Sequence, residues 1–173
     1  MCTFETMLTG GHPNSLGRTV EVVDIILADS ARLHELYNCY FSTDPVVRLR
    51  TSSAMKRISQ AKPEWLIPYI DRLLQEISEI DQASTQWTLA NLFRTLAVYM
   101  SQTQREQAEL ILKRNLATHK DWIVLNTTME TLTEWAKEDE ALKSWLLPHL
   151  DRLYEDKRKS VSGRAKKFRA VLT

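Results

Sequence analysis

The sequence predicts an all-α fold built of repeated helix pairs, a solenoid, from three observations. A segment recurs: residues 65–73 and 145–153 share Trp, Leu, Pro, Asp, Arg and Leu in the same order, at an offset of 80 positions from Trp65 to Trp145. A weaker apolar match at residues 108–116 lies near the midpoint, which indicates a unit of about 40 residues. Glycine is scarce: three of the four glycines lie in the amino-terminal segment, and a sheet protein needs more of them for its turns.

Residues 1–14 are predicted to form a flexible arm, or a loop packed over the first repeat, because they show no helical period. A Gly-Gly pair and a proline in this stretch favour turns. Gly10, Gly11 and Gly17 precede a helix and leave a second interpretation open, an anion site at the helix start. Residues 15–173 are predicted to form a single repeat domain.

The first helix pair is predicted to begin at Ser15, a capping residue, and to break between Asp29 and Ser30. Apolar residues recur at helical spacing on both sides of the break and should form the buried stripes of the two helices. These stripes are Leu16, Val20, Val23 and Leu27, then Leu33, Leu36, Tyr37 and Tyr40.

The second pair has the clearest signals, because Asp44 supplies a cap and Pro45 occupies the first helical position. Its return helix opens near Pro63. Two apolar stripes can bury each other: Val47, Thr51, Ala54, Met55 and Ile58 on the first helix, and Leu66, Ile70, Leu73, Leu74 and Ile77 on the second.

Further helices follow to the end of the chain. The third pair is predicted over residues 83–100 and 103–116, and the fourth over 121–137 and 139–156, with Pro148 kinking or splitting its last helix. A lone amphipathic helix closes the stack, with the stripe Val161, Ala165, Phe168 and Leu172.

The start of the second pair resembles the first helix of a HEAT repeat. Residues 44–48 read Asp-Pro-Val-Val-Arg, and small and apolar residues follow at helical spacing: Thr51, Ala54 and Met55. A looser match begins at Asp121, where Leu125 replaces the arginine. The resemblance covers roughly residues 15–172 and implies a right-handed α–α superhelix of about four antiparallel helix pairs plus a C-terminal capping helix.

The resemblance also implies that the second helix of each pair lines a concave surface. One face of these helices repeats an aromatic, arginine and acidic stripe at spacings of four, three and four. The predicted partner-binding residues are Trp65, Tyr69, Arg72 and Glu76 in one repeat, and Trp145, His149, Arg152 and Asp156 in the other. The alternative is that the tryptophans staple adjacent repeats while Asp71-Arg72 and Asp151-Arg152 form ordinary inter-repeat pairs. Trp135 is predicted to be a core residue, because it falls in the position that Ile58 has in the second pair.

Catalytic and metal-binding patterns are missing from the sequence. The four histidines are not spaced as ligands, and neither a Cys-x-x-Cys motif nor a glycine-rich phosphate loop occurs. Cys2 and Cys39 are predicted to be unpaired thiols, with Cys39 in the core. No apolar run approaches the roughly 20 residues that cross a bilayer. These features predict a cytoplasmic protein with neither metal nor cofactor.

Charge is unevenly distributed along the chain. Seven cations and no acid follow residue 156, so the tail carries +7 and, with a total of +1, residues 1–156 carry −6. The tail is predicted to cap the stack, with nucleic-acid contact as the alternative. A second basic cluster is predicted to lie on a solvated outer surface: Arg48, Arg50, Lys56 and Arg57.

Three functions are compatible with these patterns. The leading hypothesis is a non-catalytic scaffold that binds a protein or peptide on the concave face. The second is nucleic-acid binding, including a resemblance to the DNA-alkylation-repair glycosylases built of HEAT-like repeats, which the acidic body disfavours. The third is an enzyme such as the HEAT-containing bilin lyases, which no residue positively supports.

Overall fold

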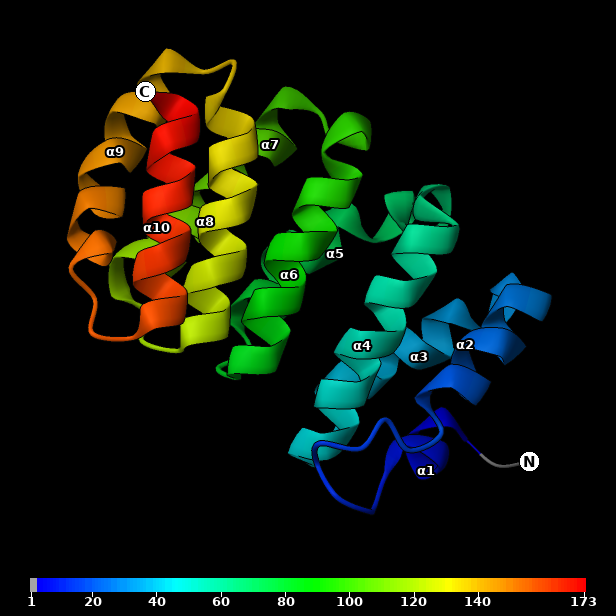
Figure 1. The fold of residues 1–173 in the computed structure, drawn as a ribbon. Coiled ribbons are helices and arrows are strands. Elements are labelled where there is room, and N and C mark those ends of the chain that lie inside the picture. Colours follow the sequence, from blue (N-terminus) through cyan, green and yellow to red (C-terminus); the bar gives the residue numbers. More distant parts are fainter. Residues whose placement is uncertain (1–2) are drawn as a thin grey trace. The chain divides into compact units, whose positions relative to one another are not determined.

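A computed structural model describes residues 3–173 and is all-α there, with ten α-helices, five short 3₁₀ helices and no strand (Figure 1). The all-helical prediction is therefore confirmed. The helices group into two compact units, Met1–Met100 and Ser101–Thr173. Cys2 lies outside the described residues, so its predicted state has no structural counterpart. Among the helices of residues 3–173, none combines the length and apolar character that a membrane crossing needs.

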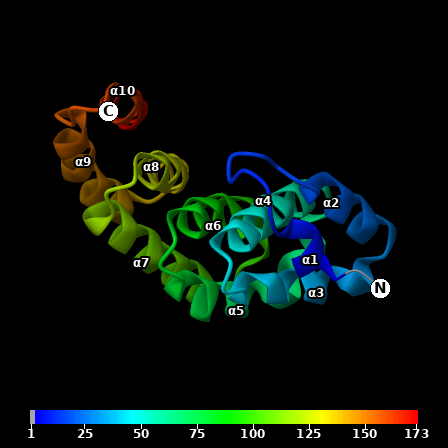
Figure 2. The same ribbon diagram turned by 90° about the horizontal axis from the view of Figure 1, so that it is seen from below.

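The first unit contains two layers of helices. Three helices pack side by side in one row, with α4 in the middle: α2 (Thr19–Ala28), α4 (Pro45–Ala61) and α6 (Ala83–Leu96). The shorter helices α3 (Leu33–Asn38) and α5 (Ile70–Gln75) lie on one side of this row (Figure 2). Helix α1 (Phe4–Leu8) packs against α4 and α2.

Helix α4 follows its sequence signals closely. The Asp44 carboxylate accepts a hydrogen bond of 2.8 Å from the Val46 amide, and Pro45 occupies the first turn, where its missing N–H costs nothing. All five residues of the predicted stripe are at most 1% exposed, including Met55 and Ile58. The core of the first unit is therefore centred on α4, as predicted.

The return helix of the second pair is broken up. A 3₁₀ helix, η3 (Pro63–Tyr69), precedes α5, and a second one, η4 (Ile77–Glu79), follows it. Pro68 lies inside η3 and has no amide hydrogen to donate to a helical bond. The predicted apolar stripe is nevertheless buried from Leu66 to Ile77. In the second unit, Pro148 occupies the same position of the repeat but sits inside one continuous helix, so the predicted split at this proline is wrong.

The first helix of the first pair differs from its prediction. Leu16, Val20 and Leu27 were expected to be buried but are 44%, 46% and 39% exposed. Gly17 has a φ of +52°, so the helix starts at Thr19 instead of Ser15. The buried face of α2 is therefore made of Thr19, Val22, Val23 and Ile26, of which Val23 alone belongs to the predicted stripe.

Part of the predicted flexible arm is folded. Helix α1 begins after Thr3, whose hydroxyl accepts from the Thr6 amide, and the side chains of Phe4 and Leu8 are fully buried. The Phe4 amide also donates to the Glu35 carboxylate at 2.9 Å. A helical period is present here, but one turn is too short for it to stand out in the sequence.

The second unit contains four helices. Helix α8 (Trp122–Ala136) packs against each of the others, which are α7 (Gln102–Thr118), α9 (Glu140–Tyr154) and α10 (Lys159–Leu172) (Figure 1). Ser101 and Gln104 form a reciprocal capping box at the start of α7. Trp135 is buried, as are the four residues of the closing stripe on α10, which confirms both predictions. The boundary between the units falls between the two helices of the third predicted pair.

Candidate binding surface

A buried cation organises the amino-terminal loop. Arg50 is only 2% exposed, which corrects the prediction that it lies on a solvated surface. The reason is its register: Arg50 follows Val47 by three residues and precedes Ala54 by four, so it belongs to the buried stripe of α4. Its guanidinium donates hydrogen bonds to four main-chain carbonyls, those of Leu8 (2.7 Å), Gly10 (2.6 Å), His12 (3.2 Å) and Ser15 (3.1 Å).

The loop can wrap around Arg50 because glycines occupy three strained positions. Gly10 and Gly11 have φ values of +75° and Gly17 one of +52°, in the region that side chains disfavour. The loop points its carbonyl oxygens at the guanidinium and therefore binds a cation. This is the opposite polarity to the anion site that the sequence left open at these glycines.

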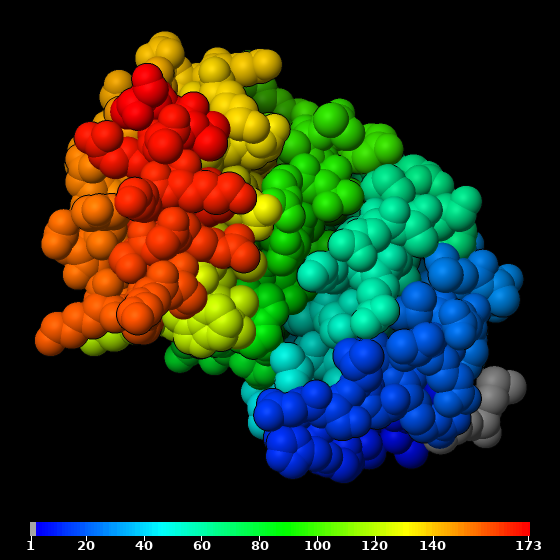
Figure 3. Space-filling model, in the orientation of Figure 1, coloured from blue at the N-terminus to red at the C-terminus, as the bar shows by residue number. Residues whose placement is uncertain are grey.

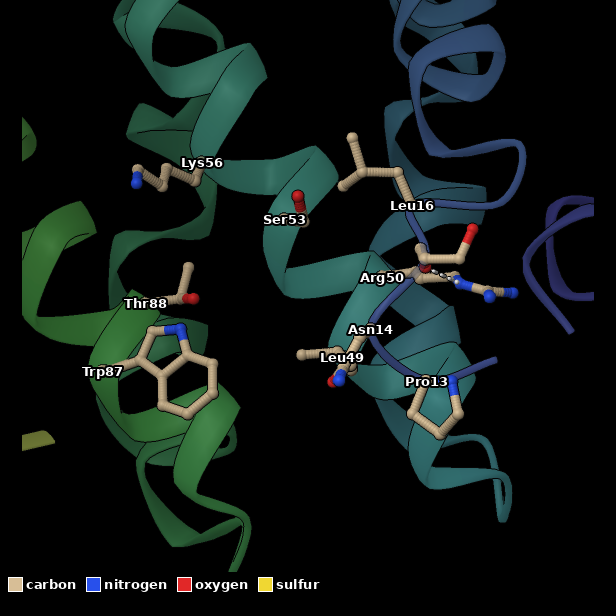
Figure 4. A pocket seen from close by; sticks show the side chains of 10 residues that line it. Pro13, Asn14, Leu16, Leu49, Arg50, Ser53, Lys56, Trp87 and Thr88 are labelled. Atoms are coloured by element: carbon tan, nitrogen blue, oxygen red, sulfur yellow. Dashed lines mark hydrogen bonds between the residues drawn. The ribbon is translucent and has the colours of Figure 1, made fainter. Parts of the chain in front are cut away.

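The loop, α4 and α6 enclose a hollow of about 340 Å³ (Figure 4). Pro13, Asn14, Ser15 and Leu16 of the loop form one wall, and Trp87 and Thr88 of α6 form the other. The floor comes from α4, through Leu49, Arg50, Ser53 and Lys56. In the space-filling view the loop, in blue, lies beside the cyan to teal surface of α4 (Figure 3).

The lining of the hollow offers apolar surface and unpaired donors. Trp87 is partly exposed and Leu16 is largely exposed, although both are apolar. Within residues 3–173, neither the Trp87 indole N–H nor the Lys56 ammonium makes a hydrogen bond. None of the ten lining residues is acidic. The hollow is thus a cleft with a positive character and room for part of a ligand.

The predicted binding residues of the first unit gather around a buried tyrosine. The Arg72 guanidinium lies 4.2 Å from the centre of the Tyr37 ring and donates to the Glu76 carboxylate at 2.9 Å. The Tyr69 and Tyr37 ring centres are 5.1 Å apart. Burial raises the pKa of Tyr37, so its phenol stays neutral. The Lys62 ammonium lies 5.9 Å from the ring centre of Trp65, the fourth predicted residue of this unit.

In the second unit, Trp145 and His149 stack, with ring centres 4.1 Å apart. The Lys113 ammonium lies 5.1 Å from the Trp145 ring centre. His149 Nδ1 is buried and has no hydrogen-bond partner in the described chain. Burial, with a smaller contribution from the Arg152 charge, lowers the pKa of His149.

Arg152 and Asp156 are engaged in separate contacts. Arg152 Nη2 donates at 3.0 Å to the carbonyl of Leu116, in the last turn of α7. Asp156 pairs with Arg158 at 2.7 Å, and this partner lowers the pKa of the Asp156 carboxyl to about 2. Most of these contacts are thus local, such as the pairs Arg72–Glu76 and Trp145–His149, whereas the Arg152 bond to Leu116 reaches a neighbouring helix.

The basic tail is partly neutralised by internal ion pairs. Arg158 pairs with Asp156, Arg169 with Asp151, and Arg164 approaches Glu130 at 3.8 Å. Three of the seven tail cations are thus balanced within the second unit. This weakens the electrostatic case for a nucleic-acid contact there.

Two further observations concern the Cys39 thiol and the metal-ligating side chains of the described residues. Cys39 is buried, and burial raises the pKa of its thiol to about 12, which leaves it protonated and unreactive. No group of three or more His, Cys, Asp and Glu side chains is placed to hold a metal ion in residues 3–173. No known family model, curated protein or solved structure matches this chain, so its function is inferred from its own residues.

Proposed function

We propose that this chain is a HEAT-like helical repeat protein that binds a protein segment and performs no catalysis. The observation that carries the proposal is the hollow beside Trp87, whose loop wall is fixed by Arg50. We also propose that its helices form the right-handed superhelix of four pairs that the sequence predicts.

Arg48 supports the repeat interpretation. This is the arginine of the Val-Arg motif, and its Nε donates at 2.6 Å to the side chain of Gln82, the residue that precedes α6. Its Nη1 donates at 2.6 Å to the carbonyl of Ser42, just before α4. One side chain thus ties the starts of two successive first helices together, as expected if they are equivalent elements of a repeat.

Binding is supported by two features of the hollow, the partly exposed Trp87 ring and the loop wall that is already ordered. Partly exposed tryptophans beside apolar side chains are frequent anchors in protein interfaces, because a large ring buries much surface at small entropic cost. The loop wall needs no rearrangement to form, since four hydrogen bonds to Arg50 already hold it. Preorganisation of this kind lowers the cost of binding.

We therefore place the main binding surface at the hollow in preference to the stripe predicted on the second helices. In that stripe, Arg72, Tyr69 and Arg152 already have partners within the chain, namely the Tyr37 ring for the first two and the Leu116 carbonyl for the third. At the hollow, Trp87 and Lys56 have no comparable contacts in the described chain.

The test is affinity capture from the native source with three proteins: the wild type, Trp87→Ala, and Trp122→Ala as a matched control. Trp122 is 48% exposed and lies in the other unit. We expect nuclease-resistant protein partners to be retained by the wild type and by Trp122→Ala and to be lost by Trp87→Ala. Equal capture by all three proteins, or capture that disappears with nuclease, would contradict the proposal.

A further inference from the structure

We infer that the hollow beside Trp87 accepts a short acidic peptide segment in which a bulky apolar side chain neighbours a carboxylate. This inference rests on the proposed function and specifies the chemistry of the partner.

The apolar part of the segment is indicated by the two walls. Leu16 and Pro13 stand on one side and the Trp87 indole on the other, with Leu49 between them (Figure 4). A bound apolar side chain would cover these residues, and removing their surface from water is favourable. The aliphatic part of Arg50, which also lines the hollow, adds to this apolar surface. About 340 Å³ accommodates one large side chain with its neighbouring backbone.

The acidic part is indicated by charge complementarity. The charged residues that line the hollow, Arg50 and Lys56, are both cations. In the described chain Arg50 is held by carbonyl groups, and no ion pair neutralises it. The carboxylate whose pKa it helps to lower, that of Asp44, is occupied by the Val46 amide and the Thr9 hydroxyl. A carboxylate entering the hollow would meet the unpaired ammonium of Lys56, whereas a basic segment would be repelled.

A peptide fits better than a nucleic acid for two reasons. Single-stranded nucleic acids are bound by successive aromatic platforms along a basic groove, whereas the hollow has one indole and one free ammonium. The Trp87 N–H and the Asn14 side chain can instead pair with the carbonyls of an extended peptide.

The experiment is a selection from a phage-displayed library of random linear peptides on the intact protein, followed by affinity measurement of synthetic hits by fluorescence anisotropy. We expect the hits to carry Asp or Glu beside Phe, Trp or Leu and to lose affinity in Trp87→Ala. Lys56→Glu should weaken them by about tenfold, and added salt should weaken them as well. The matched control is Arg57→Glu, an exposed neighbour on α4 that does not line the hollow, for which we expect less than a twofold change.

The outcomes separate the two proposals. Hits that depend on Trp87 but are neutral or basic, or that ignore Lys56→Glu, overturn the acidic chemistry and leave peptide binding in place. An absence of hits that depend on Trp87 overturns both. Tighter binding of an oligodeoxythymidine than of any peptide, with the same dependence on Trp87, also overturns the inference. Unchanged circular dichroism and melting of Lys56→Glu would establish that its effect is local.

Discussion

Gly17 packs directly against the guanidinium of Arg50: a Cβ built on Gly17 would lie 2.8 Å from Arg50 Cζ and 2.9 Å from Nη1. The guanidinium is fully buried and bonded on several sides, so it cannot move aside. The loop conformation and the position of the buried cation are therefore interdependent.

Gly17→Ala should destabilise the first unit by more than about 1 kcal/mol, because it combines a strained φ with this collision. Urea denaturation would measure the loss. Gly10→Ala is the first control, since it has positive φ but nothing within 4 Å, and it should cost less. Gly163→Ala is the second: this glycine lies in α10 with open space around it, so alanine should stabilise by about 0.5–1 kcal/mol. Equal costs for Gly17→Ala and Gly10→Ala would exclude the collision.

Arg50→Lys should cost about 3 kcal/mol or more, although it preserves the charge. Lysine cannot present a planar fork to four carbonyls, and the oxygens left unpaired remain desolvated. Hydrogen–deuterium exchange should show lost protection in residues 9–18. Arg57→Lys, on the exposed face of the same helix, should stay within about 0.5 kcal/mol. If both variants were equally stable, the carbonyl cage would contribute nothing.

Met55→Asp and Leu73→Asp should each unfold the first unit, because both side chains are fully buried on the apolar stripes of the second pair. An unpaired buried carboxylate costs several kcal/mol, comparable with the stability of a small domain. Near-ultraviolet circular dichroism would report the loss of packing. Leu110→Asp is the control, since Leu110 is 67% exposed and should tolerate the charge.

Arg72→Ala and Arg152→Ala should each lower the melting temperature, by the equivalent of about 0.5–1.5 kcal/mol. Arg72 loses its stacking on Tyr37 and its exposed pair with Glu76, and Arg152 loses its bond to the Leu116 carbonyl. Differential scanning calorimetry of each single variant would measure the change. A melting temperature identical to that of the wild type would contradict the structural role of both arginines and leave them available to bind a partner.

Acidification should destabilise the second unit through His149. Because burial lowers the pKa of His149 below its ordinary value of 6.5, the folded state favours the neutral ring and the unfolded chain binds more protons. Stability contributed by His149 is therefore complete above pH 6.5 and falls as the pH drops below it. Melting temperatures between pH 7.5 and 5.5 should decline less in His149→Gln than in the wild type. The exposed His34→Gln variant should keep the full decline.

The periodic parts of the fold could be predicted because burial imposes the period. Helix α4 carries a cap, a first-turn proline and a stripe, three local signals that agree, and the structure matches all of them. The closing helix α10 is equally regular. In α2 the local signals were ambiguous, because apolar residues such as Val20 and Val22 occupy both faces, and only packing on α4 selects between them.

The candidate site was harder to predict because it depends on long-range contacts. Arg50 looks like an ordinary surface residue by type, and only its register between Val47 and Ala54 signals burial. The three glycines near it could have been matched with a buried cation, but spacing alone does not tell whether a loop presents amides or carbonyls. Trp87 gave no signal as a wall of the hollow, because its opposite wall lies about 70 residues earlier in the chain.

The hydrogen bonds of Arg50 join residues that are 35 to 42 positions apart in the sequence. Since these bonds require α4 to be formed with its arginine turned inward, we expect the loop to become ordered late in folding. During synthesis, residues 8–15 are made well before Arg50, so their carbonyl groups lack this hydrogen-bond partner at first. A pulse of labelling or proteolysis applied early in refolding should therefore find the loop open while α4 is already protected.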